Sequence, residues 1–98
     1  MSGYNVVKFT VKDGMDDQFL SINRELHFDA PGFKNAHMIK TGKHNYCFIG
    51  EWESAADSIN AEDSMVSLLN KFRDTLETQG QDKGVTDAIV GEEVVSYH

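Results

Sequence analysis

The segment FKNAHMIKTGKHNYCFIGEWE, residues 33–53, holds two stretches that alternate between apolar and polar side chains. Residues 33–41 and 45–53 are rich in aromatic and β-branched residues, which strands favour. The short connection at residues 42–44 contains a glycine, which suits a hairpin loop. This segment therefore predicts two strands that pair as an antiparallel hairpin.

Strand and helix patterns continue outward from the hairpin in both directions. Toward the amino terminus, residues 15–26 repeat apolar side chains every three or four positions, which predicts a helix, and residues 4–12 alternate as a strand does. Toward the carboxyl terminus, residues 60–80 carry the apolar stripe of a second long helix, with Gly80 placed to end it. Residues 85–97 predict a last strand with a break near its middle.

The predicted order of elements is strand, helix, strand, strand, helix, strand. This order is the split βαβ, or ferredoxin-like, arrangement of the α+β class, in which a four-stranded antiparallel sheet carries both helices on one face. The chain is long enough for one core, so we expect residues 1–98 to form a single domain. The other face of the sheet would expose valine, tyrosine and other aromatic side chains. We therefore expect a second copy to cover it, giving a homodimer.

Composition and charge exclude several classes of partner. The formal net charge is −7, and lysine and arginine form no cluster, so we expect no binding to nucleic acid or to anionic membranes. The first residues lack the pattern of a signal peptide, and no apolar run approaches the ~20 residues that span a bilayer. The lone Cys47 rules out a disulfide framework and suits a reducing compartment. These features predict a cytoplasmic protein.

Three short motifs carry a resemblance to a known family. They are Ala-Pro-Gly-Phe at residues 30–33, Gly-Glu-Trp-Glu-Ser at residues 50–54 and Gly-Glu-Glu-Val-Val at residues 91–95. Together with the order of elements, they make the chain similar to the antibiotic biosynthesis monooxygenase-like group of dimeric α+β barrels. The resemblance covers nearly the whole chain. It implies that the sheets of two subunits face each other to form a barrel, and that each subunit holds a pocket between its helices and its sheet.

The resemblance implies two chemistries and a non-catalytic alternative. Some members oxygenate aromatic polyketides with dioxygen and without a metal or flavin, whereas others degrade haem with a tryptophan and a histidine from the second long helix. Residues 55–79 contain neither tryptophan nor histidine, so the haem-degrading motif has no match here. The resemblance then implies a cofactor-independent monooxygenase that acts on a small aromatic or quinone-like molecule. The alternative is a dimer that binds a small ligand or serves in a stress response without catalysis.

The catalytic candidates follow from what cofactor-free oxygenation needs. A pocket must hold a phenol, help to remove its proton and stabilise the resulting anion. In the second predicted strand, Phe33, Asn35 and His37 share a face by alternation. We predict His37 as the general base, with Asn35 and Tyr46 as hydrogen-bond donors. The alternative is that the same asparagine and histidine face water or the other subunit.

Four further residues form the predicted substrate-binding set. Trp52 shares a strand face with Tyr46, and its large ring suits either a substrate or packing at an interface. His27, near the end of the first helix, could reach the mouth of the pocket or serve only as a cation at a helix C-terminus. Phe33 and Phe72 complete the set with aromatic surface.

We expect no cofactor and no metal. The four histidines lack the close spacings of metal ligands. The chain also lacks a phosphate-binding glycine loop, a nucleophile elbow and a dinucleotide fingerprint. The enzyme hypothesis then depends on whether Asn35, His37 and their neighbours meet at a closed apolar pocket.

Overall fold

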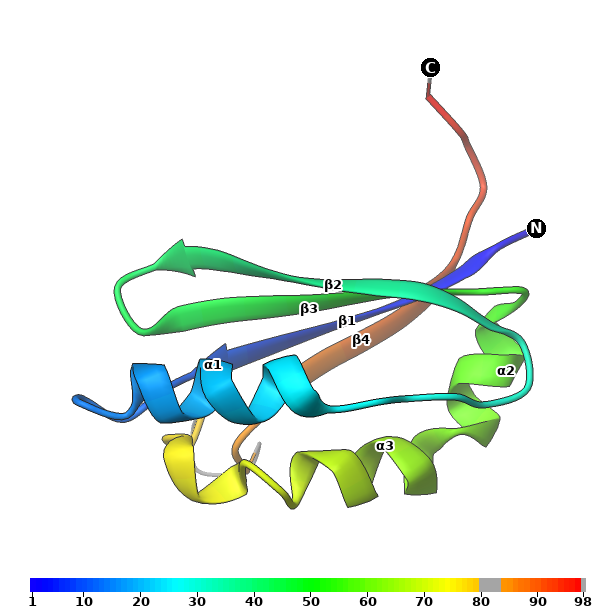
Figure 1. Ribbon diagram of the computed structural model, residues 1–98. Helices are drawn as coiled ribbons and strands as arrows, with labels where there is room; N and C mark the ends of the chain where they lie inside the picture. Colours follow the sequence, from blue (N-terminus) through cyan, green and yellow to red (C-terminus); the bar gives the residue numbers. More distant parts are fainter. Residues whose placement is uncertain (80–83, 98) are drawn as a thin grey trace.

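Four antiparallel strands form one sheet in the computed structural model, which describes residues 1–79 and 84–97 (Figure 1). The strands are β1 (Gly3–Thr10), β2 (Phe33–Gly42), β3 (Asn45–Trp52) and β4 (Asp87–Glu92). Their order across the sheet is β2-β3-β1-β4, and each neighbouring pair is antiparallel. The predicted ferredoxin-like sheet is therefore confirmed.

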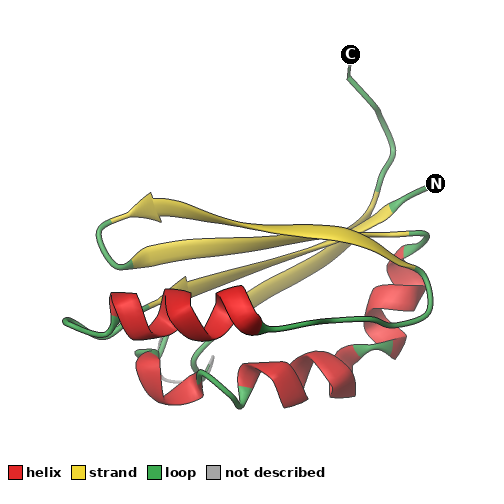
Figure 2. Ribbon diagram, in the orientation of Figure 1, coloured by secondary structure: helices red, strands yellow, loops and turns green. Residues whose placement is uncertain are grey.

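Within the described residues, three α-helices lie on one side of this sheet (Figure 2). They are α1 (Asp16–Glu25), α2 (Ala55–Asn60) and α3 (Glu62–Leu69), followed by a 3-10 turn at Arg73–Thr75. We name the side of the sheet that faces the helices the inner face and the opposite side the outer face. No helix in this part of the chain is long and apolar enough to cross a membrane.

The inner face of the sheet and the helices enclose an aromatic core. Phe9 of β1 and Tyr46 of β3 are register partners, so their side chains share the inner face. Phe19 of α1 and Phe72 pack against them, with ring centroids 4.9 Å apart for Phe19 and Tyr46 and 5.6 Å apart for Phe9 and Phe72. Each such pair contributes about 0.5–1.5 kcal/mol beyond the burial of its apolar area. The apolar faces predicted for the first strand and the first helix meet in this core.

The second long helix is shorter than predicted, because the chain becomes extended and pairs with the residue after β1 before the apolar stripe is complete. α3 ends at Leu69, whereas Leu76 has extended backbone angles (φ −105°, ψ 144°) and forms a β-bridge with Val11. The Thr75 hydroxyl donates to a carbonyl three residues back at 2.6 Å, inside the 3-10 turn. The stripe is therefore divided between a helix and an isolated β-bridge. Gly80, predicted to end the helix, lies outside the described residues.

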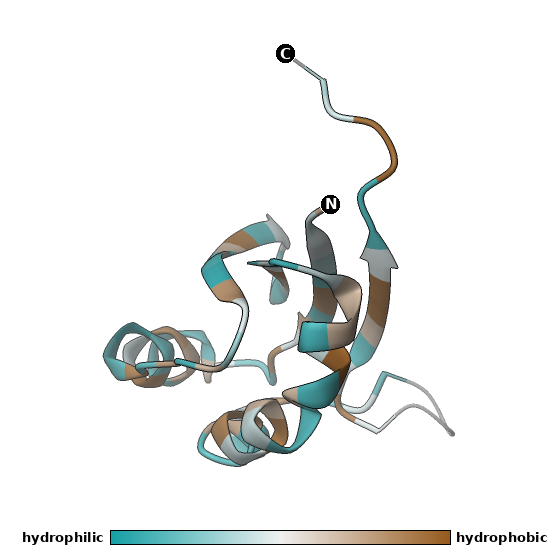
Figure 3. Ribbon diagram, turned by 90° about the vertical axis from the view of Figure 1, so that its right-hand side faces the viewer, coloured by the Kyte–Doolittle hydropathy of each residue, from teal (hydrophilic) through white to brown (hydrophobic). Residues whose placement is uncertain are grey.

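The last strand is also shorter than predicted. β4 ends at Glu92, which pairs with Gly3, and the next residue, Glu93, donates its backbone N–H to the Ser2 carbonyl at 2.8 Å. Because β1 begins at Gly3, the ladder between these two strands stops here. Residues 94–97 continue away from the sheet (Figure 3). Val94, Val95 and Tyr97 of this segment are exposed.

Candidate functional site

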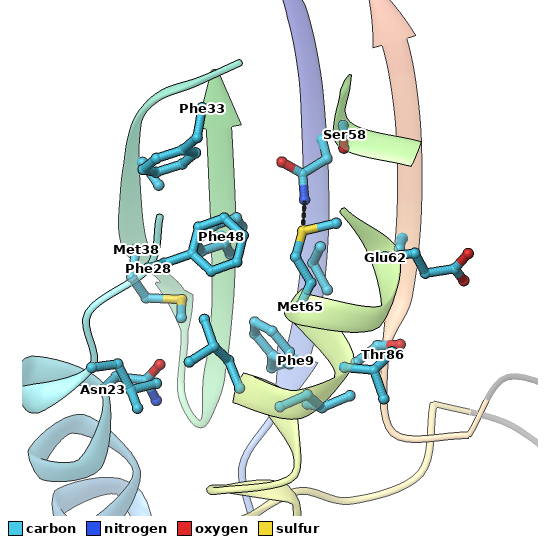
Figure 4. Close-up of a pocket in the computed structure, with 18 of the residues that line it drawn as sticks. Phe9, Asn23, Phe28, Phe33, Met38, Phe48, Ser58, Glu62, Met65 and Thr86 are labelled. Carbon is cyan, nitrogen blue, oxygen red and sulfur yellow. Dashed lines mark hydrogen bonds between the residues drawn. The ribbon is translucent and has the colours of Figure 1, made fainter. Parts of the chain in front are cut away.

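A cavity of about 730 Å³ lies between the inner face of the sheet and the helices (Figure 4). Its lining comes from all four strands, from α1 and the segment after it, and from α2 and α3. Most of the lining is apolar, and it includes Phe28, Phe33, Met38, Phe48, Met65 and Phe72. An apolar cavity of this size suits a small molecule with an aromatic ring.

One side of the cavity carries a buried amide whose orientation is fixed. Asn5 of β1 is 2% exposed, and its Oδ1 accepts a hydrogen bond from Trp52 Nε1 at 2.8 Å. An indole N–H can only donate, so the amide must turn its oxygen toward Trp52. The Asn5 Nδ2 lies 3.4 Å from the Met65 sulfur, which is a weak acceptor. The amide therefore presents its N–H donors toward the cavity, where the sulfur holds one of them only weakly.

Two glycines allow close packing around this polar group. Gly50 of β3 is the register partner of Asn5, and a Cβ at Gly50 would overlap Asn5 Oδ1 and lie 3.2 Å from Trp52 Nε1. Gly3 allows α2 to sit directly on β1, because a Cβ there would overlap the backbone of Ala55. The absence of side chains at these two positions lets the strand, the tryptophan and the helix meet.

A buried hydroxyl without a protein partner lies at the same cavity. Ser58 of α2 lines the cavity and is fully buried, at 0% exposed. Among the described residues, the Ser58 hydroxyl is the one buried side-chain group that makes no hydrogen bond. Figure 4 shows Ser58 and Met65 on the helix side of the cavity. Leaving such a group unpaired costs about 1–3 kcal/mol of stability, so native proteins seldom retain one without a reason.

Trp52 lies behind the amide and outside the cavity lining. It is fully buried and packs against Phe33 and Phe28, with ring centroids 5.2 Å and 5.8 Å away. The sequence suggested either substrate binding or packing for this residue. Its contacts are those of a packing residue that also holds Asn5 in one orientation. Trp52 therefore acts on the cavity through Asn5.

The cavity brings together some of the residues predicted for the site. Those in its lining are His27, Phe33, His37 and Phe72. Asn35 and His37 share a face as predicted, but Phe33 does not share it, because the pairing of β2 with β3 shifts register between Phe33 and Asn35. Phe33 packs against Trp52 on the inner face. His37 is an exposed residue of the edge strand, and its register partner is Ile49 on the outer face.

Asn35 lies on the outer face, away from the cavity lining. Its Nδ2 donates to Glu51 Oε1 at 3.0 Å, and the Ser2 hydroxyl donates to Glu51 Oε2 at 3.1 Å. The hydrogen bond from Asn35, followed by that from Ser2, holds the pKa of Glu51 below its ordinary value. The catalytic role of Asn35 stays a prediction.

Tyr46 is buried at the other end of β3, outside the cavity lining. Its hydroxyl donates to Asp16 Oδ2 at 2.7 Å, and His44 Nδ1 lies 2.6 Å from Asp16 Oδ1. The bond from Tyr46 lowers the pKa of Asp16, and the same bond raises the pKa of Tyr46. These side chains tie the hairpin turn, where His44 has a φ of 62°, to the start of α1. The catalytic role of Tyr46 also stays a prediction.

The sequence-based reasoning missed Asn5 and Ser58. Asn5 left a readable signal, because it is the one polar residue in an alternating face that continues with Val7, Phe9 and Val11. Ser58 left none, since its burial depends on how α2 packs against β1. No group of three or more His, Cys, Asp or Glu is placed to hold a metal ion within residues 1–79 and 84–97.

Comparison with known proteins bears on the fold. No protein-family model matches the chain, and no curated protein matches it in sequence. Among solved structures, a variant of SnoaB, a cofactor-independent oxygenase from Streptomyces nogalater, is 14% identical and has a TM-score of 0.68. The match covers 97% of this chain and 95% of that one.

Two further solved structures agree with this match. A Nitrosomonas europaea protein provisionally named an antibiotic biosynthesis monooxygenase is 10% identical, with a TM-score of 0.73 over 95% of this chain and 90% of that one. A dimeric ferredoxin-like protein from an uncultured marine organism is 12% identical, with a TM-score of 0.74 over 99% and 91%. The likeness is one of fold. The chain shares the ferredoxin-like fold of proteins that carry the monooxygenase name, as the resemblance in its sequence implied.

Proposed function

We propose that this chain is a cofactor-independent monooxygenase that acts on a small aromatic or quinone-like molecule bound in the cavity. One observation carries the proposal. The apolar cavity, which Phe33 and Phe72 line among other rings, has the Asn5 amide at its wall, and the bond from Trp52 turns the N–H donors of that amide toward the cavity. Such a site can hold a flat ring and stabilise negative charge on one of its oxygen atoms. SnoaB, which has the same fold, is named a cofactor-independent oxygenase, and this adds support.

The proposed reaction needs only the substrate and dioxygen. Loss of a proton from a phenol leaves an electron-rich anion, which can pass electrons to dioxygen. A ring carbon that bears one hydrogen then becomes a carbonyl, so that the phenol becomes a quinone: one oxygen atom enters the product, and the other leaves as water with that ring hydrogen and the hydroxyl hydrogen. The substrate is thus the only reductant, and the protein binds it, removes the proton and stabilises the anion.

The proposed roles go to residues that line the cavity. Asn5 Nδ2 is the donor that stabilises the anion, and it replaces Asn35 and Tyr46, which bond carboxylates elsewhere. His27, in the segment after α1, is the first candidate for the general base, because it lies in the cavity lining. His37, the base predicted from the sequence, is the second candidate: it also contributes to the lining, but its register partner Ile49 places its side chain on the outer face.

The decisive experiment is dioxygen consumption by the purified protein with a panel of phenols and hydroquinones. We expect turnover with at least one of them and incorporation of one atom of labelled dioxygen into the product. His37→Ala and His27→Ala identify the base, since losing a general base lowers the rate by about 100-fold or more. His44→Asn is the matched control, because His44 lies outside the lining and asparagine tolerates its positive φ.

A non-catalytic role in binding a small ligand is the second candidate function. The buried polar groups at the cavity, Asn5 and Ser58, are neutral. The titratable residues of the lining are exposed; they are His27, His37 and Glu62. This distribution favours binding without catalysis. Tight binding of a phenol without dioxygen consumption would contradict the enzyme and support this role.

We also propose that two copies pair through the outer face of the sheet. Val6 is the register partner of both Ile49 and Ile89, so these three form an apolar row across the outer face, where Ile89 is 67% exposed. Ile39, 47% exposed, extends the apolar surface on β2. The described helices cover the inner face only, and a solved protein of this fold is described as dimeric.

Light scattering tests this pairing through the mass of the particle in solution. The wild type should have the mass of a dimer, and Ile89→Lys should have the mass of a monomer, because it places a charge in the apolar row. Ser67→Lys adds the same charge on the helix side and should remain dimeric. A monomeric wild type would contradict the proposed pairing.

A further inference from the structure

We propose that Ser58 is a ligand-recognition residue whose hydroxyl bonds an uncharged oxygen atom, a carbonyl or a phenol, of the molecule bound in the cavity. This inference rests on the cavity being a binding site, as in the proposed function. It adds the class of atom that the buried polar side of the cavity recognises.

Two serines on neighbouring helices show why Ser58 is unusual. Ser67 in α3 is exposed and donates to the carbonyl of Asp63, four residues back, at 3.1 Å. That bond is a common way for a serine inside a helix to satisfy its hydroxyl. Ser58 in α2 makes no such bond, although it is fully buried and lines the cavity. A group that is buried, unpaired and at a cavity wall is placed to bond something inside the cavity.

The neighbouring amide defines what that partner must be. Asn5 turns its N–H donors toward the cavity, because the Trp52 indole occupies its oxygen. A serine hydroxyl can either donate or accept. A carbonyl oxygen of the ligand can accept from Asn5 or from Ser58, and a phenol can accept from Asn5 or donate to Ser58. A ligand oxygen is therefore a group that suits each of the two side chains.

The buried polar groups also favour a ligand that enters without charge. Within the described residues, the buried polar side chains are Asn5, Ser58 and Thr75, and none of them carries a charge. A carboxylate that entered this part of the cavity would lose its hydration without meeting a buried cation. A ketone, a quinone or a protonated phenol does not have this cost. The chemistry therefore selects a neutral oxygen on an otherwise apolar ring.

The test compares 1-naphthol with naphthalene, two probes of the same ring system that differ by one hydroxyl. Binding to the full chain is followed by ¹H–¹⁵N NMR, because Trp52 is the single tryptophan and its indole N–H reports on the bond to Asn5. The wild type should bind 1-naphthol more tightly than naphthalene. Ser58→Ala should weaken the binding of 1-naphthol about tenfold and leave the binding of naphthalene unchanged.

Two further variants and one stability measurement make the comparison specific. Ser67→Ala is the matched control, because it removes a hydroxyl that bonds within its own helix, and it should bind both probes as the wild type does. Ser58→Thr keeps a hydroxyl and should bind 1-naphthol more tightly than Ser58→Ala. The thermal midpoint of Ser58→Ala should equal or exceed that of the wild type, because the variant removes an unpaired buried group.

The outcomes separate this inference from the proposed function. Equal binding of 1-naphthol by the wild type and by Ser58→Ala would overturn the inference and leave the cavity as a binding site. Failure of the wild type to bind either probe would overturn both. A lower thermal midpoint for Ser58→Ala, together with an equal loss of affinity for 1-naphthol and naphthalene, would show that the hydroxyl stabilises the fold. This result would also overturn the inference.

Discussion

Tyr46 and Trp52 lie on the same face of β3, and both are buried aromatic residues with a polar tip. The Tyr46 hydroxyl bonds the carboxylate of Asp16, which also bonds His44. The Trp52 indole N–H bonds the neutral amide of Asn5. The bond from Tyr46 lies beside the aromatic core at one end of β3, whereas the bond from Trp52 lies beside the cavity at the other end.

The two ends of β3 differ because of the hydrogen-bond partner, more than because of the aromatic residue. The partner of Tyr46 is Asp16, and the partner of Trp52 is Asn5. At the Tyr46 end, the carboxylate accepts from the phenol and bonds the imidazole, so the three side chains satisfy one another. At the Trp52 end, Asn5 uses its oxygen for the indole and keeps its N–H groups toward the cavity, while Ser58 has no partner among the described residues. Satisfied polar groups hold a fold together, and unsatisfied ones beside a cavity are available to a ligand.

Trp52→Phe should have the largest effect, because it removes the hydrogen bond to Asn5 at the end of β3 beside the cavity. It removes the donor to Asn5 Oδ1, leaves that buried oxygen unpaired and takes volume from the cluster with Phe28 and Phe33. We expect the free energy of unfolding, measured in urea, to fall by about 3 kcal/mol. The binding of 1-naphthol should weaken as well, since the Asn5 amide can then exchange the positions of its oxygen and nitrogen atoms. A loss of stability below about 1 kcal/mol would contradict the organising role of this bond.

Gly50→Ala should have the next largest effect, because its Cβ would enter the space that the Asn5–Trp52 bond occupies. We expect the free energy of unfolding to fall by about 2 kcal/mol and the Trp52 indole resonance to move. Gly42→Ala is the matched control, since its Cβ would meet only ordinary contacts, with Asn45 Nδ2 at 3.5 Å, and should change stability by about 0.5 kcal/mol or less. Equal losses in the two variants would contradict the special role of position 50.

Tyr46→Phe should have a smaller effect that is confined to stability. It removes one hydrogen bond to a carboxylate that is partly exposed, so the free energy of unfolding should fall by about 1 kcal/mol. The affinity for 1-naphthol should equal that of the wild type, because Tyr46 lies outside the cavity lining. A clear fall in affinity would place Tyr46 in the site and restore its predicted catalytic role.

The smallest effect concerns the acid side of the stability profile. The bond from Tyr46 lowers the pKa of Asp16 below its ordinary value of 3.8 in the folded chain. Above that ordinary value the stabilisation is fully present. As the pH falls below it, the unfolded chain takes up the proton first, so the stabilisation is lost until the pH passes the lowered pKa. The wild type should therefore lose more stability than Asp16→Asn in this window. Urea midpoints at a series of acid pH values measure the loss, and parallel profiles would contradict it.

Most of the fold could be predicted from the sequence, because strand and helix patterns depend on near neighbours. Alternation in residues 4–12 and 33–53 marked three strands, and the spacing in residues 15–26 marked α1. The errors lie where contacts between distant segments override the local pattern. The second long helix gives way to a β-bridge at Leu76, and the face predicted from Phe33 is interrupted by a register shift.

The candidate site could be predicted only in part, for the same reason. Aromatic residues such as Phe33 and Phe72 reach the cavity because apolar side chains gather on the inner face wherever the elements pack. Asn35 and Tyr46 do not reach it, because a register shift and a bond to Asp16 place them elsewhere. No local pattern contains that information.

The sequence by itself determined the order of the elements, their apolar faces and the ferredoxin-like sheet, since periodicity and turn residues act over a few positions. Only the tertiary structure decided which polar tips find partners. Trp52 with Asn5 and Tyr46 with Asp16 join positions 47 and 30 residues apart, so the chain must fold before either bond exists. The Ser58 hydroxyl became a candidate recognition group in the same way, because its burial and its lack of a partner both arise when α2 packs on β1.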